Sequence, residues 1–152
     1  MSHQSCYLED LAVGQRYTGG TATVDLAAIK AFAAAFDPQP FHLDEAAGRA
    51  SVFGRLVASG WHTMALTMRM LVEGELRPLS GLVGLGADGL RWPRPVVPGD
   101  TLSVTWEVME LRPSSSKPDR GTARLQVTTR NQRGEIVLTL ITTILVPRRP
   151  PA

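Results

Sequence analysis

An acidic residue and a histidine lie five positions apart in the segment Asp37-Pro-Gln-Pro-Phe-His42. Proline fixes its own backbone φ angle and keeps the preceding residue out of the helical region, so Pro38 and Pro40 predict a stiff, extended turn. In such a turn both side chains can face one water molecule or one substrate proton. General acid–base catalysis uses a pair of this kind, because one group removes a proton while the other delivers one. Taken singly, each residue also has a structural interpretation, Asp37 as a helix-end residue and His42 as a loop histidine. Composition alone favours these structural interpretations over catalysis.

The backbone N–H of Gly60 is a second group that could act on a substrate. Ser59 is a typical N-cap residue, so Ser59-Gly60 predicts a helix that begins here. The first N–H groups of a helix have no partner within it and lie at the positive end of the helix dipole. A thioester carbonyl placed there would find a donor for the charge that builds up on its oxygen. The alternative is a glycine that serves only a tight entry into the helix. His62, in the first turn, has a structural interpretation.

The helix that follows is the element around which the rest of the chain must be arranged. Its apolar residues lie on nearly all sides and are Trp61, Met64, Ala65, Leu66, Met68, Met70, Leu71 and Val72. A helix at a protein surface usually shows one polar face. We therefore expect this helix to be enclosed on most of its sides, with Arg69 reaching a partner or a polar edge.

The remaining chain predicts two helices and five strands. Asp25 is a predicted cap for a helix over residues 26–36, and Asp44 for a short helix over residues 45–50. Alternation of apolar and polar residues and the positions of glycine and proline predict strands over residues 15–24, 79–92, 101–111, 121–130 and 135–146. The last of these is apolar on both faces in places, which is typical of a central strand.

The composition is that of a globular protein with one domain. Of its 152 residues, 43% are hydrophobic and 20% are charged, and the formal charge is +2. This charge is too small to predict binding to nucleic acid, and no apolar run is long enough to predict a membrane span. The first ten residues have no apolar signal core and Cys6 is the only cysteine, so we expect a cytoplasmic protein without an internal disulfide. Arg91, Arg94 and Arg112 could meet phosphates, although solvent exposure is the simpler interpretation of each.

Three segments together resemble the MaoC-like acyl dehydratases, a family that includes the (R)-specific enoyl-CoA hydratases. They are Asp37-Pro-Gln-Pro-Phe-His42-Leu-Asp44, Leu56-Val-Ala-Ser-Gly-Trp-His62 and Leu90-Arg-Trp-Pro-Arg-Pro-Val-Val-Pro-Gly-Asp100. The similarity covers roughly residues 7–147. The first segment is fairly specific, because its acid–histidine spacing matches the usual pattern Asp-x-Asn-Pro-x-His. Gln39 departs from that pattern, which usually has Asn.

The resemblance implies an α+β hot-dog fold, in which an antiparallel sheet wraps around a central helix, in one domain over residues 1–152. It implies a homodimer or a dimer of dimers, and reversible addition of water to trans-2-enoyl thioesters of coenzyme A or acyl carrier protein, without a metal or another cofactor. Asp37 and His42 would hold the water between them, and the N–H of Gly60 would contact the thioester oxygen. The acyl chain would run along the central helix. The implied substrate-binding residues are Gln39, Ser59, Trp61, Met64 and Met68.

Two other functions are compatible with the same fold. Hot-dog thioesterases generally carry their carboxylate on the central helix, where this chain offers only Glu73 at the far end. A non-catalytic subunit that binds acyl thioesters, or that stabilises a partner, would not need the Asp37/His42 pair. We therefore rank both below the hydratase.

Overall fold

A computed structural model of the protein describes residues 5–152; the first four residues, on which part of the signal-sequence prediction rests, lie outside the described part. Among the described residues, no helix is both long enough and apolar enough to cross a membrane. The elements, in chain order, are a 3-10 helix (Leu8–Asp10), β1 (Arg16–Thr23), α1 (Leu26–Phe36), α2 (Pro40–Leu43), α3 (Glu45–Ala50), α4 (Gly60–Val72), β2 (Val83–Arg91), β3 (Thr101–Pro113), β4 (Arg120–Arg130) and β5 (Ile136–Pro147).

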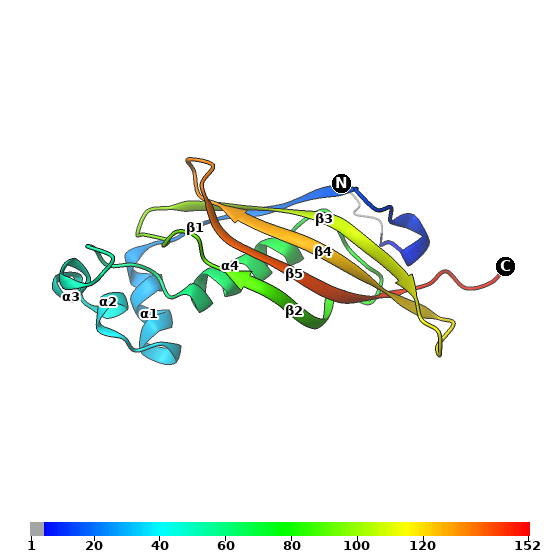
Figure 1. Ribbon diagram of the computed structural model, residues 1–152, viewed down its shortest axis with the longest axis horizontal. Helices are drawn as coiled ribbons and strands as arrows, with labels where there is room; N and C mark the ends of the chain where they lie inside the picture. The colour runs from blue at the N-terminus through cyan, green and yellow to red at the C-terminus, as the bar shows by residue number, and fades with distance from the viewer. Residues whose placement is uncertain (1–4) are drawn as a thin grey trace.

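The five strands form one antiparallel sheet in the order β1-β3-β4-β5-β2. Alternate residues of a strand point to the same side of a sheet. Those of β3 and β4 that face the core are buried and are Leu102, Val104, Trp106, Val108, Ala123, Leu125 and Val127. The sheet curves over α4, which lies along its inner side (Figure 1). The hot-dog fold that the resemblance implied is therefore confirmed, and so is the predicted alternation.

Glycines let α4 approach the sheet closely. A Cβ on Gly19 of β1 would collide with the side chain of Val104 and would lie 2.7 Å from the carbonyl oxygen of Met70 in α4. A Cβ on Gly74, just after α4, would lie 2.8 Å from the Cα of Gly19. The register of β1 on β3 shifts at this point. A glycine in a strand often marks such an approach of another backbone, and here it lets the end of α4 lie directly on β1.

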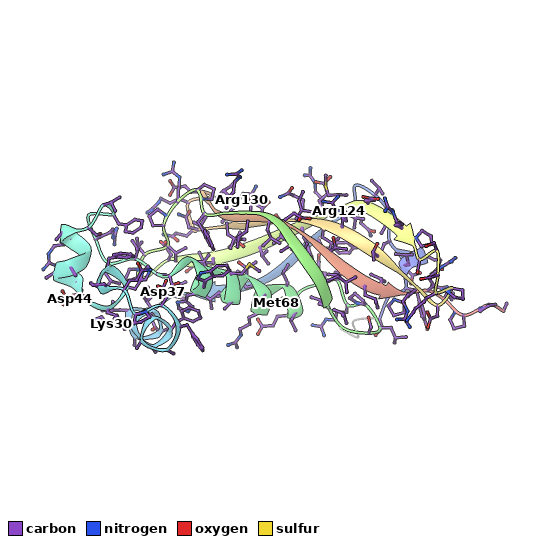
Figure 2. The ribbon with its side chains drawn as sticks, turned by 60° about the horizontal axis from the view of Figure 1, so that its bottom comes forward. Lys30, Asp37, Asp44, Met68, Arg124 and Arg130 are labelled. Carbon is purple, nitrogen blue, oxygen red and sulfur yellow. The ribbon has the colours of Figure 1, made fainter. Side chains whose placement is uncertain are left out.

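The prediction that α4 is enclosed on most of its sides is wrong for the single chain. Trp61, Met68 and Val72 have exposed fractions of 58%, 39% and 53%. Met68 lies on the side of α4 that faces away from the sheet (Figure 2). The buried side of α4 includes threonines, and the hydroxyl of Thr67 donates to the carbonyl oxygen of Thr63 at 2.8 Å. Because threonine can satisfy its hydroxyl within the helix, it can face the core.

One local prediction also needs correction. Pro40–Leu43 forms a short helical turn, where the sequence predicted an extended segment. Proline is well tolerated in the first turn of a helix, because its missing N–H needs no partner there. The prediction that the last strand is a central one is confirmed, because β5 has a neighbouring strand on each side.

The helices α1, α2 and α3 form an end of the molecule beyond the start of α4 (Figure 1). The side chain of Asp25 accepts from the N–H of Ala28 at 2.7 Å and caps α1. The side chain of Asp44 accepts from the N–H of Ala47 at 2.8 Å and caps α3. Both caps confirm the sequence prediction. The cap on α3 lies at the end of the short segment that carries Asp37 and His42.

Candidate active site

The carboxylate of Asp37 and the imidazole of His42 are in direct contact. Oδ2 of Asp37 lies 3.1 Å from Nε2 of His42, and the two side chains are 17% and 6% exposed. Asp37 follows α1 directly, between the helical end and α4 (Figure 2), and the turn of α2 brings His42 back towards it. Because this is a direct hydrogen-bond distance, a water cannot lie between the two atoms. A catalytic water would have to contact the two side chains from one side of this hydrogen bond.

The Asp37/His42 pair holds a shared proton. Nδ1 of His42 lies 2.7 Å from the carbonyl oxygen of Val57. A carbonyl oxygen only accepts, so Nδ1 carries a hydrogen. If Nε2 carried none and Asp37 were ionised, two lone pairs would face each other across 3.1 Å. A proton between them removes this repulsion.

Three neighbouring side chains favour the ionised form of Asp37. Burial by itself raises the pKa of Asp37, but hydrogen bonding by Ser59 and Gln39 and the charge of His42 outweigh it, so the pKa is lowered. Nε2 of Gln39 donates to Oδ1 of Asp37 at 2.6 Å. The glutamine that departs from the family pattern therefore binds the carboxylate directly.

The N–H of Gly60 has no acceptor among the described residues. Gly60 is the first residue of α4, and Ser59 is the N-cap, as predicted. The hydroxyl of Ser59 accepts from the N–H of Trp61 at 3.2 Å. The carbonyl oxygen of Ser59 accepts from the N–H groups of His62 and Thr63. Only the Gly60 N–H of this first turn is left to bind a ligand, and it lies at the positive end of the helix.

Trp92 covers Gly60. The indole N–H of Trp92 donates to the carbonyl oxygen of Gly60 at 2.9 Å. A Cβ on Gly60 would lie 2.6 Å from the ring of Trp92. The rings of Trp61 and Trp92 meet edge to face, with their centroids 5.3 Å apart. Gly60 is thus required by a side chain that lies far along the sequence.

A cavity of about 490 Å³ brings these groups together. Its volume lies within the usual range of small-molecule sites. The predicted site residues that line it are Asp37, Gln39, His42, Gly60 and Trp61. Ser59 is 1% exposed and is not part of the lining. Met64 and Met68 lie further along α4, also outside the lining. Substrate contact by these last three residues stays a prediction.

Several residues of the cavity wall had no role in the sequence analysis. They are Phe41, Phe53, Val57, Ala58, Thr63, Trp92, Pro93, Pro95 and Val96. Arg94 also lines the cavity, although its sequence interpretation was a solvated side chain. The N–H of Ala58 donates to the carbonyl oxygen of Val96 at 2.8 Å and holds the proline-rich segment beside the start of α4. The proline-rich motif was visible in the sequence, but its position against α4 was not.

Two other residues that were weighed for function lie outside this cavity. His62 is buried and stacks on Phe32 with an interplanar angle of 6°. Burial lowers the pKa of His62, which favours its neutral form and agrees with its structural interpretation. Glu73 follows the last turn of α4 and forms an ion pair of 2.9 Å with Arg69, which is the partner expected for that arginine.

The fold and the cavity define a hot-dog protein with a carboxylate–histidine pair beside a free helix N–H. A family model described as the MaoC like domain matches residues 10–131. The chain therefore belongs to the MaoC-like domain family. The resemblance inferred from the three sequence segments is confirmed.

The chain is similar to solved structures and to curated proteins of this family. A MaoC-like dehydratase from Rhodospirillum rubrum is 52% identical, with a TM-score of 0.92, and the match covers 97% of this chain and 100% of that one. The R-hydratase PhaJ1 from Pseudomonas aeruginosa is 29% identical, with a TM-score of 0.73, over 97% of this chain and 96% of that one. The mesaconyl-CoA hydratase of Haloarcula marismortui is 36% identical over 92 residues, which are 60% of this chain and 25% of that enzyme.

Proposed function

We propose that this protein adds water reversibly to trans-2-enoyl thioesters of coenzyme A or acyl carrier protein. The observation that carries the proposal is the contact between Asp37 and His42 in the same cavity as the free N–H of Gly60. Hydration needs a group that takes a proton from water, a group that supplies one to Cα, and a donor for the enolate oxygen. Similarity to proteins named R-hydratase and mesaconyl-CoA hydratase supports the same class of reaction.

The proposed reaction leaves the protonation of the Asp37/His42 pair unchanged after each turnover. The pair begins with one shared proton. As the oxygen of the water attacks Cβ, the pair accepts a proton from that water and delivers a proton to Cα. The number of protons on the pair after a turnover is the same whichever of the two groups performs each transfer. The pair therefore supplies both proton transfers, and the proposed steps use no cofactor besides the carrier thiol of the substrate.

The N–H of Gly60 would act on the other end of the reacting system. When water adds to Cβ, the electron pair of the double bond moves towards the thioester and places negative charge on its oxygen. A fixed N–H at the start of a helix stabilises that charge without reorganising during the reaction. Removing one such donor typically lowers kcat by about 10²- to 10³-fold.

A steady-state assay with crotonyl-CoA and longer trans-2-enoyl-CoA thioesters tests the proposed function. We expect loss of the enoyl absorbance. Release of free thiol in its place would identify a thioesterase. Ligand-induced stabilisation without either reaction would identify a non-catalytic acyl-thioester-binding subunit. Both of these outcomes would overturn the hydratase proposal.

Substitution Gly60→Ala is expected to lower turnover by roughly ten- to a hundredfold. A backbone N–H cannot be removed by changing a side chain, but it can be displaced. The added methyl group would lie 2.6 Å from the ring of Trp92, so either the indole or the start of α4 must move. The double variant Gly60→Ala/Trp92→Leu provides space and should recover part of the turnover. Turnover like that of the wild type in Gly60→Ala would show that the position of this N–H is not important.

The outward face of α4 supports a homodimer as the working unit. Its exposed apolar residues are Trp61, Met68 and Val72, and those of β2 are Val83 and Leu85. β2 is an edge strand, so one side of its backbone is free to pair with another strand. Apolar patches of this kind on soluble proteins usually mark an interface. In a dimer formed through this face, Met64 and Met68 would lie near the junction of the two chains, where an acyl chain could contact them.

Sedimentation velocity on matched variants tests the dimer. The wild type is expected to sediment with twice the 16.4 kDa mass of the chain. Met68→Glu buries a charge in the proposed interface and should shift the population towards the monomer. Met109→Glu is the control, because Met109 is similarly exposed, at 48%, but lies in β3, away from α4. A wild type that is monomeric at high concentration, or an equal effect of both variants, would contradict this assembly.

A further inference from the structure

We propose that Arg94 makes the site selective for thioesters that carry an anionic group, a carboxylate or a phosphate, which it binds at the rim of the cavity. The inference rests on the proposed function, because it concerns the thioester that the same cavity would bind. Arg94 lies between β2 and β3 and lines the cavity. Its side chain is also 60% exposed. A residue that both lines a cavity and reaches solvent lies at the opening.

Arg94 is the only lysine or arginine among the described residues that line the cavity. Much of the surrounding wall is aromatic or proline, and Trp92, Pro93 and Pro95 are its neighbours in the chain. The one carboxylate in the described lining is Asp37, and its contact with His42 compensates its charge.

Arg94 shares its ion-pair partner with a second arginine. Nη1 of Arg94 lies 3.1 Å from Oε2 of Glu135. The same carboxylate also pairs with Arg133, whose Nε lies 2.8 Å from Oε1. Two cationic side chains therefore share one anionic side chain. A guanidinium has five N–H donors in a planar fork, a geometry that matches the oxygens of a carboxylate or a phosphate. Because Glu135 engages one edge of Arg94, donors remain for a ligand.

Two parts of a thioester substrate could supply the anion. A second carboxylate on a short acyl chain lies only a few bonds from the thioester carbonyl, and hence near Gly60. The phosphates of coenzyme A lie at the far end of the pantetheine arm. N-acetylcysteamine thioesters separate the two sources, because they keep the thioester and lack the phosphates. Crotonyl and fumaryl groups likewise provide short enoyl chains without and with a second carboxylate.

The test measures kcat and KM with crotonyl and fumaryl thioesters of both coenzyme A and N-acetylcysteamine. Arg94→Met keeps the apolar stem of the side chain and removes the charge. We expect it to raise KM roughly tenfold for thioesters that carry the relevant anion, with kcat within about twofold. KM for crotonyl-N-acetylcysteamine, which carries neither anion, should not change. An effect confined to fumaryl thioesters identifies the carboxylate, and one confined to coenzyme A thioesters identifies the phosphates.

Arg133→Met is the matched control, because Arg133 pairs with the same Glu135 but does not line the cavity. It should leave KM for all four thioesters unchanged. A similar rise in both variants, or a rise for crotonyl-N-acetylcysteamine in Arg94→Met, would overturn the role of Arg94. If the wild type hydrates none of the four, the proposed function fails. The dissociation constants of the unreacted thioesters are then measured from the fluorescence of the cavity residues Trp61 and Trp92. Arg94→Met should weaken the binding of the thioesters that carry the relevant anion, and Arg133→Met should not.

Discussion

Asp37→Asn is expected to lower kcat for hydration of crotonyl-CoA at least a hundredfold. Asparagine has nearly the same shape, so it can keep a contact with Gln39 and can face Nε2 of His42. It cannot take up a proton at neutral pH. The shared proton of the pair is lost with the carboxylate, and with it one of the two proton transfers. Loss of an acid–base partner typically costs about 10²- to 10⁴-fold.

The control for this variant is Asp44→Asn. Asp44 lies seven residues further along the same segment, and its carboxylate caps α3. Asparagine caps helices as well as aspartate does, so this variant should fold normally and keep its turnover. Thermal unfolding of both variants should stay close to that of the wild type. Turnover like that of the wild type in Asp37→Asn would remove Asp37 from the mechanism.

His42→Gln is expected to lower kcat by at least a hundredfold as well. The imidazole of His42 makes two contacts at once, to the carbonyl oxygen of Val57 at 2.7 Å and to Oδ2 of Asp37 at 3.1 Å. A glutamine amide can reproduce one of these contacts, but it does not exchange protons with substrate at neutral pH. His62→Gln is the control, because His62 lies outside the cavity and should change turnover by no more than a few-fold.

The double variant Asp37→Asn/His42→Gln tests whether the two residues work as one unit. If the pair shares a single proton, the second substitution removes little that the first has left. The double variant should then be about as slow as the slower single variant, since groups that act together show effects far from additive. Two losses that multiply would contradict the shared proton and would assign an independent role to each residue.

Local patterns in the sequence were enough to predict much of the fold. Asp25 and Asp44 each precede a helix and cap it, because an N-cap interaction reaches only two or three residues along the chain. The alternation in β3 and β4 placed the correct side chains in the core, because a strand has a period of two residues. The spacing of Asp37 and His42 also led to a correct expectation of their convergence, although the helical turn of α2 was missed.

The parts of the site that only the tertiary structure decided are contacts between distant segments. Val57 sets the hydrogen on Nδ1 of His42, and Trp92 occupies the space beside Gly60. Arg94 is a cavity residue because its segment is held beside the start of α4. None of these partners lies within a turn of the residue it affects. Residue types and spacing therefore determined α1, α3, α4, the five strands and the reactive pair. Packing determined the proton on that pair, the cover over Gly60 and the open face of α4.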